Sequence, residues 1–174
     1  AAAVDEGERD CGPPPPRHAF DFDGIGAGLA LPGGLAAELS AKGAFALGCW
    51  LRLEEGSHEG GLLYSLLDTR AETGVEVTMQ PSAQQLLVSV YCERKEKGGG
   101  GGALGGGLRL LKGAAAPERV SLGGFSLQPG RWHHLLLCFR KGKLLGGKSE
   151  ALAYVDGARA QATHCAYPQL LPDA

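Results

Sequence analysis

Hydrophobic and polar positions alternate with a period of two along much of this chain. The clearest run covers residues 43–55, where five apolar side chains fall on one side: Phe45, Leu47, Cys49, Leu51 and Leu53. Successive side chains of a β-strand point to opposite faces, so this alternation predicts a strand with one face turned towards a core.

The same pattern recurs in segments separated by glycine, proline and polar turn residues. These segments are residues 18–24, 60–69, 74–80, 84–94, 130–142 and 150–165. In the segment 84–94, the predicted apolar face holds Leu86, Val88, Val90 and Cys92. Asp156-Gly157 separates two alternating runs, which predicts a two-residue hairpin. Residues 35–42 predict one helical turn or a short helix, capped by Gly43, and the many short strands predict an all-β sandwich.

Two segments break the alternation. Residues 97–119 are rich in glycine, which loses much backbone entropy on ordering and offers few side chains to pack. We expect a disordered, low-complexity loop insertion between two strands, which costs about 1 kcal/mol in loop closure.

Residues 1–17 are acidic and then proline-rich, as in a linker, so residues 18–174 are expected to form the domain. Without an initiator Met or an apolar opening segment, we expect a piece of a longer protein.

Composition and charge narrow the classes of function. A length of 174 residues suits one domain. Seventeen basic and nineteen acidic residues give a net charge of −2, which argues against binding to nucleic acid or to an anionic membrane surface. No apolar stretch is long enough to span a bilayer. The five cysteines include no C-x-x-C pair, which favours a reducing compartment over a disulfide framework.

The histidines and tryptophans of the predicted strands are expected to be structural. His133 and His134 are adjacent on a strand and therefore point to opposite faces. We expect one of them to be buried and hydrogen-bonded and the other to face outwards, rather than both to bind a metal. Trp50 and Trp132 lie within strands, and we expect core packing to explain both better than a sugar-stacking platform.

No motif predicts catalysis, a resident cofactor or a metal. The serines lack a G-x-S-x-G motif, and burial of Cys49 and Cys138 in apolar strands would raise the pKa of their thiols and reduce their reactivity. A glycoside hydrolase needs two carboxyl groups on one face. Asp21 and Asp23 lie at the end of a strand, and Glu76 stands alone in its strand, so neither site meets that need.

Two basic runs are candidates for contact with a partner. They occupy residues 92–97 (CERKEK) and 140–143 (RKGK). Their cations are Arg94, Lys95, Lys97, Arg140, Lys141 and Lys143. Solvated loops would explain both runs, and the functional alternative is electrostatic contact with an acidic protein surface.

Four motifs in order carry a resemblance to a known superfamily. FDFDG at residues 20–24 is followed by FALGCWLRLEE at 45–55, then by GRWHHLLLCF at 130–139 and AYVDG at 153–157. Together they resemble the concanavalin A-like, laminin G-like superfamily, in which W-H-H followed by Y-V-D-G is a recurring closing signature. The resemblance implies a jelly-roll sandwich of two antiparallel sheets, in which the tryptophan and the DG hairpin are structural.

Further short motifs are similar to the concanavalin A-like domain of large BEACH-domain proteins of the neurobeachin type. They are LLYSLLDTRAETGVEV, VYCERKEK, VSL and AYPQL. This resemblance implies a non-catalytic interaction module of a cytoplasmic scaffold involved in vesicle trafficking and membrane dynamics. Its partners would be proteins or neighbouring domains of the scaffold, with no nucleic acid, no cofactor and at most an indirect association with membranes.

Two other functions stay open. A secreted laminin G or pentraxin-like domain would bind calcium and glycans, although the chain has no asparagine to contribute to such a site. Free thiols would fit the cytoplasmic interpretation, whereas one or two disulfides would fit secretion. A pair of carboxyl groups about 5–10 Å apart in a groove would instead favour a glycoside hydrolase on the same fold.

Overall fold

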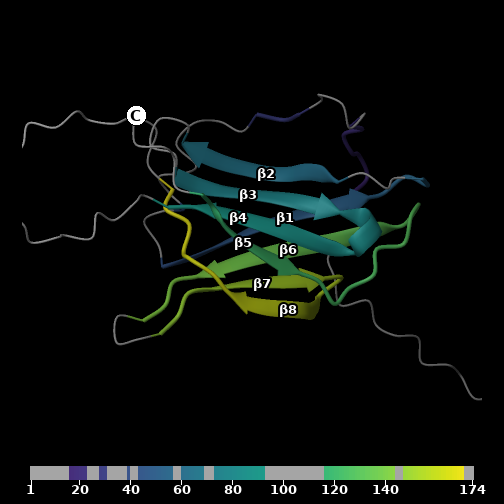
Figure 1. Ribbon diagram of the computed structural model, residues 1–174. Helices are drawn as coiled ribbons and strands as arrows, with labels where there is room; N and C mark the ends of the chain where they lie inside the picture. Colours follow the sequence, from purple (N-terminus) through teal and green to yellow (C-terminus); the bar gives the residue numbers. More distant parts are fainter. Residues whose placement is uncertain are drawn as a thin grey trace, which may run out of the picture.

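The computed structural model of this protein consists of two antiparallel four-stranded sheets that stack with the hydrophobic core between them (Figure 1). One sheet has the strand order β1-β6-β7-β8 and the other has the order β2-β3-β4-β5. The structure describes residues 16–22, 28–30, 39, 43–56, 60–68, 73–92, 116–143 and 147–170.

The described residues form eight strands, and all of them except β5 follow a predicted segment. They are β1 (Ala44–Arg52), β2 (Gly61–Asp68), β3 (Thr73–Gln80), β4 (Gln85–Tyr91), β5 (Glu118–Leu122), β6 (Trp132–Arg140), β7 (Glu150–Val155) and β8 (Ala158–His164). A single 3₁₀ turn, η1 (Pro81–Ala83), connects β3 to β4. The prediction of an all-β sandwich is confirmed.

Most strands pair with their neighbours in sequence, and β1 is the exception. The strands β2 to β5 form one meander and β6 to β8 form another. The strand β1 is a direct neighbour of β6, although β2 to β5 lie between them in the sequence. The strand β1 therefore completes its ladder only after the chain has passed through the whole of the other sheet. All these pairings are antiparallel.

The core is built from alternate residues of both sheets. The predicted apolar face of β4 is confirmed, because Leu86, Val88 and Val90 are buried. The facing sheet contributes the buried side chains of Leu135, Leu137 and Phe139 from β6. At one end of the core, the Phe45 and Phe139 rings stack with their centroids 4.9 Å apart.

The predicted hairpin at Asp156-Gly157 is confirmed as the turn between β7 and β8. Asp156 has φ of 51° and Gly157 has φ of 82°. Positive φ at both central residues is the geometry of a type I′ turn, which matches the twist of the strands it joins.

The first predicted strand is wrong in the part that the structure describes. Residues 16–22 form no strand, and the side chains of Phe20 and Phe22 are 73% and 50% exposed. Alternation gives a segment an apolar face, but a strand also needs a neighbouring strand that pairs with its backbone N–H and C=O groups. No described strand does so for residues 16–22.

The predicted glycine-rich insertion ends two residues too late. Glu118 and Arg119 belong to β5, where they pair with Val90 and Ser89 of β4. Most of the remaining insertion lies outside the described residues. The helix predicted over residues 35–42 does too, apart from Leu39, which packs against the core.

Candidate functional site

Three of the cations predicted to face a partner lie at the end of β6 and in its connection to β7. Arg140 is the last residue of β6, and Lys141 and Lys143 follow it. All three are exposed. The other predicted cations lie outside the described residues: Arg94, Lys95 and Lys97.

The base of this β6–β7 connection is held by backbone contacts. The Lys141 N–H donates to the Gly43 carbonyl at 2.8 Å, and the Gly142 N–H donates to Ser149 Oγ at 3.0 Å. The Gly147 N–H donates to the Lys143 carbonyl at 3.2 Å. Glycine is needed at position 142, because a Cβ atom there would overlap the carbonyl of Gly147.

The connection carries a net positive charge. From residue 140 to residue 150 the chain has the cations Arg140, Lys141, Lys143 and Lys148 against the single carboxylate of Glu150. Arg140 Nη1 lies 3.6 Å from Glu150 Oε1, an exposed pair of the kind that contributes about 0–1 kcal/mol. Lys141 Nζ lies 5.9 Å from the centroid of the Tyr167 ring, within the range of a cation–π contact.

The second basic run begins at the same end of the molecule. Figure 1 shows that β4 and β6 end on the same side of the sandwich. The Ala166 N–H donates to Glu118 Oε2 at 3.0 Å, and Glu118 pairs with Val90 near the end of β4. The preceding Cys165 N–H donates to the Ser149 carbonyl at 3.2 Å, beside the base of the β6–β7 connection. We call the described residues of the β6–β7 connection (140–143 and 147–150), together with Cys92 at the start of the second run, the basic end.

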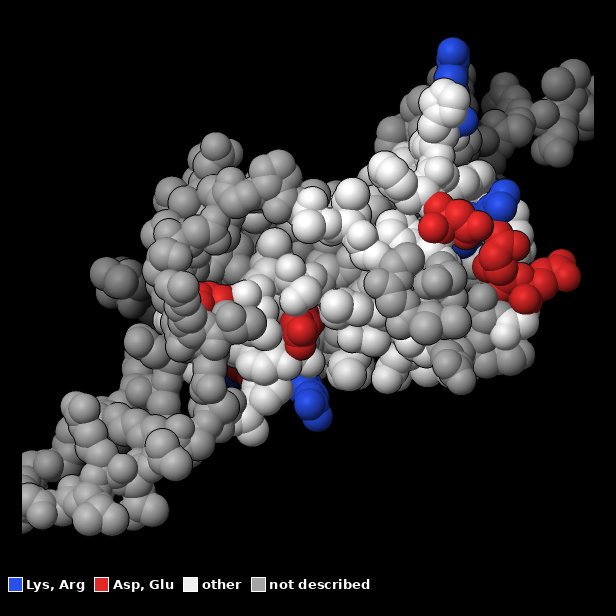
Figure 2. All heavy atoms as spheres, turned by 90° about the horizontal axis from the view of Figure 1, so that it is seen from above, with Lys and Arg blue, Asp and Glu red and all other residues white. Residues whose placement is uncertain are grey.

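A different charge pattern is visible on the face shown in Figure 2. On the described part of that face, the Asp and Glu side chains form the largest charged group, at one end, while Lys and Arg side chains are scattered. The basic character is therefore local and does not extend over this face of the sandwich.

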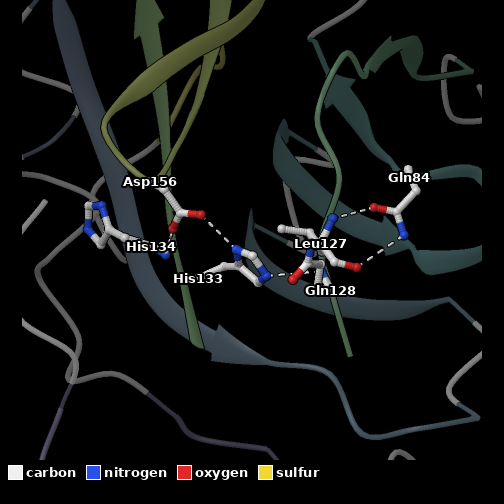
Figure 3. Close-up of polar contacts among 6 residues, drawn as sticks. All are labelled: Gln84, Leu127, Gln128, His133, His134 and Asp156. Carbon is white, nitrogen blue, oxygen red and sulfur yellow. Dashed lines mark hydrogen bonds and ion pairs between the residues drawn. The ribbon is translucent and has the colours of Figure 1, made fainter. Parts of the chain in front are cut away.

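A buried histidine links β6 to the β7–β8 turn (Figure 3). His133 is 3% exposed, and Nε2 accepts a hydrogen bond from the Gln128 N–H at 3.0 Å. Nδ1 therefore carries the proton, which it donates to Asp156 Oδ2 at 2.7 Å. His134 lies on the opposite face of β6 and is partly exposed. The prediction of one buried, hydrogen-bonded histidine and one outward-facing histidine is confirmed.

The same contacts define the chemistry of Asp156. Partial burial acts to raise the pKa of this carboxyl, but the hydrogen bonds from His133 and from the His134 N–H outweigh burial and lower the pKa below 3.8. An Asp–His pair activates a nucleophile only when the second ring nitrogen can accept its proton. Here the Gln128 N–H occupies that nitrogen, so the pair positions the β7–β8 turn against β6.

A glutamine that the sequence analysis did not single out continues this network. Gln84 Nε2 donates to the Pro81 carbonyl at 2.9 Å, and Gln84 Oε1 accepts the N–H of Leu127. Figure 3 shows how Leu127 and Gln128 join this contact to His133. Residue 84 and residue 127 are far apart in sequence, and no local pattern indicates that an amide side chain will reach the backbone of a distant loop.

The outer face of the β2-β3-β4-β5 sheet carries a second polar cluster. Tyr91 OH donates to Glu76 Oε2 at 2.7 Å, and Ser65 Oγ donates to Glu76 Oε1 at 3.3 Å. The hydrogen bond to Glu76, with a smaller effect of burial, raises the pKa of Tyr91. Both contacts to Glu76 come from hydroxyl groups, so they do not form the carboxyl pair of a glycoside hydrolase.

The expectation that Trp50 and Trp132 pack in the core is wrong. Trp50 pairs with His134, and Trp132 with Arg52, on the outer face of β1 and β6, where both indole rings are partly exposed. The Trp50 and His134 rings lie 5.2 Å apart, and the Arg52 guanidinium lies 5.5 Å from the centroid of the Trp132 ring. Residue type suggested burial, but strand alternation decides the face.

Comparison finds no matching protein family, no matching curated protein and no matching solved structure. The site is therefore defined by its own residues and contacts.

The described ranges contain neither a cluster of metal-binding side chains nor a membrane-spanning helix. Within those ranges, no three His, Cys, Asp or Glu side chains come together as a group that could hold a metal ion. The described residues also include no helix with the length and apolar character that a membrane span requires.

Proposed function

We propose that this chain is a concanavalin A-like jelly-roll domain of the neurobeachin type, with a glycine-rich loop insertion between β4 and β5. The two stacked antiparallel sheets support this proposal. So does the position of the shared motifs: W-H-H begins β6, and Y-V-D-G ends β7 and forms the turn into β8. The domain serves as a non-catalytic interaction module of a large intracellular scaffold in vesicle trafficking and membrane dynamics.

The observation that carries the interaction role is the net positive charge of the basic end. Arg140, Lys141 and Lys143 are exposed on a connection whose base donates backbone hydrogen bonds to Gly43, just before β1, and to the Ser149 hydroxyl, just before β7. A charged surface of this kind selects an oppositely charged partner and increases the rate of association. The partner we propose is an acidic surface of another protein or of a neighbouring domain of the scaffold.

Chemical features of the described residues support a non-catalytic role. The Asp156–His133 pair has no ring nitrogen left to accept a proton from a nucleophile. Burial raises the pKa of the Cys49 and Cys138 thiols, which reduces the fraction of reactive thiolate.

Charge reversal at the basic end tests the proposal. The variant R140E/K141E/K143E is compared with R17E/R52E/R159E, which changes the net charge equally at exposed positions elsewhere. The probe is immobilised polyglutamate, with retention measured as salt concentration rises. We expect the wild-type chain and the control variant to be retained at low salt and the basic-end variant to pass through. Equal loss in both variants would show that only net charge matters and would contradict the proposal.

A second measurement separates the intracellular module from the secreted alternative. Ca²⁺ bound to the native state would raise the melting temperature by mass action. We expect no shift when Ca²⁺ is added to the purified chain. A clear rise, accompanied by binding to a glycan array, would instead favour a laminin G or pentraxin-like domain that binds calcium and glycans.

A further inference from the structure

Two cysteines from different sheets point into the core at the basic end. Cys92 directly follows β4 and continues the face of Val88 and Val90, which are buried. Cys165 directly follows β8, extends the ladder with β7 through its N–H bond to Ser149, and is 7% exposed. Both side chains pack against the same hydrophobic cluster. Strand alternation thus directs both thiols into the space between the two sheets.

Glu118 shows that the two cysteine segments lie beside each other. It pairs with Val90, two residues before Cys92, and its Oε2 accepts the N–H of Ala166, the residue after Cys165. Burial, together with the charges of Glu118 and Cys92, raises the pKa of Cys165 to about 11. An electrostatic effect of Cys92 on Cys165 is consistent with the proximity that the backbone contacts indicate.

We propose that Cys92 and Cys165 form an intramolecular disulfide in the presence of an oxidised thiol such as glutathione disulfide, linking the end of β4 to the segment that follows β8. The other two described cysteines are placed differently. Cys138 lies on the outer face of β6, and Cys49 lies on the edge strand β1 beside Tyr64 of β2. No disulfide joins the described cysteines in the structure, so the pair begins in its reduced form.

The reaction proceeds by two thiol–disulfide exchanges. Cys92 is only partly buried, whereas Cys165 is buried, so the thiolate of Cys92 attacks glutathione disulfide first. This step forms a mixed disulfide and releases one glutathione thiolate. The thiolate of Cys165 then attacks Cys92 Sγ and releases the second glutathione. Two protein thiols are oxidised, glutathione disulfide is reduced to two thiols, and the two protons pass through solvent to the glutathione thiolates.

The bond would connect two parts of the basic end. Cys92 is the first residue of the run 92–97, and Cys165 lies two residues before Tyr167, whose ring contacts Lys141. Oxidation would therefore fix the start of one basic run close to the base of the other. The bond forms only when an oxidised thiol is supplied, so the pair stays reduced in a reducing compartment and the proposal agrees with the intracellular role. Its formation does not depend on the proposed partner, so its failure and the failure of the interaction role are distinguishable.

Peptide mapping of the oxidised chain tests the pair. The reduced 174-residue chain is incubated with glutathione disulfide, the remaining thiols are alkylated, and tryptic peptides are analysed without reduction. Trypsin places the five cysteines on separate peptides. We expect peptide 71–94 joined to peptide 160–174, with the linkage lost on addition of dithiothreitol. Cys92 held as a stable mixed disulfide while Cys165 is alkylated would overturn the proposal.

Matched variants and an unfolded control make the result specific. C92A and C165A should each abolish the linked peptide, whereas C49A and C138A should retain it. The wild-type linkage is measured independently, so the test stands if a core variant fails to fold. When the chain is unfolded by guanidinium before oxidation, the amount of Cys92–Cys165 linked peptide should fall to that of the other cysteine pairs. An equally dominant linkage in the unfolded chain would show that the fold does not create the pair and would refute it.

Discussion

His133 and Asp156 show how a few hydrogen bonds fix a local structure. Asp156 occupies the first central position of the β7–β8 turn, with φ of 51°, and its two carboxylate oxygens accept bonds from His133 Nδ1 and from the His134 N–H. The buried imidazole is satisfied at both nitrogens, which avoids the cost of an unpaired polar group in the core. One side chain thus holds a turn against a strand from the same sheet.

Removing the Asp156 carboxylate should destabilise the fold. In D156A, the buried His133 N–H and the His134 N–H lose their acceptor, so we expect a loss of about 1–3 kcal/mol in the free energy of unfolding. In D156N the loss should be smaller, because asparagine keeps one acceptor oxygen and tolerates positive φ. Denaturant titration measures both variants. Wild-type stability in D156A would show that the contact contributes nothing.

The lowered pKa of Asp156 also predicts a dependence on pH. The folded pKa lies below the unfolded value of 3.8, so the unfolded state binds the proton first as the pH falls. The stabilisation by this carboxylate is present above that value and is lost as the pH falls through the folded pKa. Thermal unfolding between about pH 6 and about pH 2.5 should therefore show a shallower loss of stability in D156N than in wild type. Identical slopes would contradict this assignment.

At the scale of elements, turn geometry and alternation determine different things. The β7–β8 hairpin follows from Asp156-Gly157, because few residues accept positive φ at both central positions. Alternation assigns the faces of β1, so Trp50 points away from the core although its size and apolar surface favour burial. A strand also needs a partner, and none of the described strands pairs with residues 16–22 despite their alternating pattern.

Substitution of Gly157 tests the turn. Gly157 has φ of 82°, so the Cβ of G157A would be strained, and we expect a loss of about 1–2 kcal/mol in the free energy of unfolding. Gly43 provides the matched control, because it lacks a positive φ and a Cβ there would meet open space. We expect G43A to stay close to wild type in denaturant unfolding. Equal effects in the two variants would contradict the I′ turn.

At the scale of the whole molecule, contacts distant in sequence hold the two sheets together. The network from Gln84 through Leu127 and Gln128 to His133 crosses from one sheet to the other (Figure 3). The strands β1 and β6 are paired, although all four strands of the other sheet lie between them in the sequence. Such non-local pairings slow folding, because the loops between them must close before the contacts form.

Deletion of the glycine-rich segment tests its role in the whole domain. The strands β4 and β5 are antiparallel neighbours, with Val90 opposite Glu118, so a short linker can replace residues 97–115. We expect cooperative unfolding with a change of about 1 kcal/mol or less, because the cost of loop closure varies slowly with length. A Gly/Ser segment of the same length serves as the control. Loss of cooperative unfolding in both variants would show that side chains of this segment contribute to the core.

Much of the local structure was predictable from residues, and the site was predictable only in part. The alternation of Leu86, Val88 and Val90 correctly predicted a buried face, and the adjacent His133 and His134 correctly predicted opposite environments. The basic residues were visible as two runs, but only contacts of Glu118 and Ser149 place Cys92, where the first run begins, at the same end of the sandwich as the β6–β7 connection. Glu118 itself was assigned to the insertion, because its short strand lies next to the glycine-rich segment.

The sequence by itself determined most of the strands, their inward faces and the Asp156-Gly157 turn, because periodicity and turn chemistry act between near neighbours. Only the tertiary structure decided that β1 pairs with β6, that Gln84 reaches Leu127, and that the segments of Cys92 and Cys165 lie together. Each of these depends on where distant segments lie once both sheets have packed, and the same local pattern is compatible with several pairings.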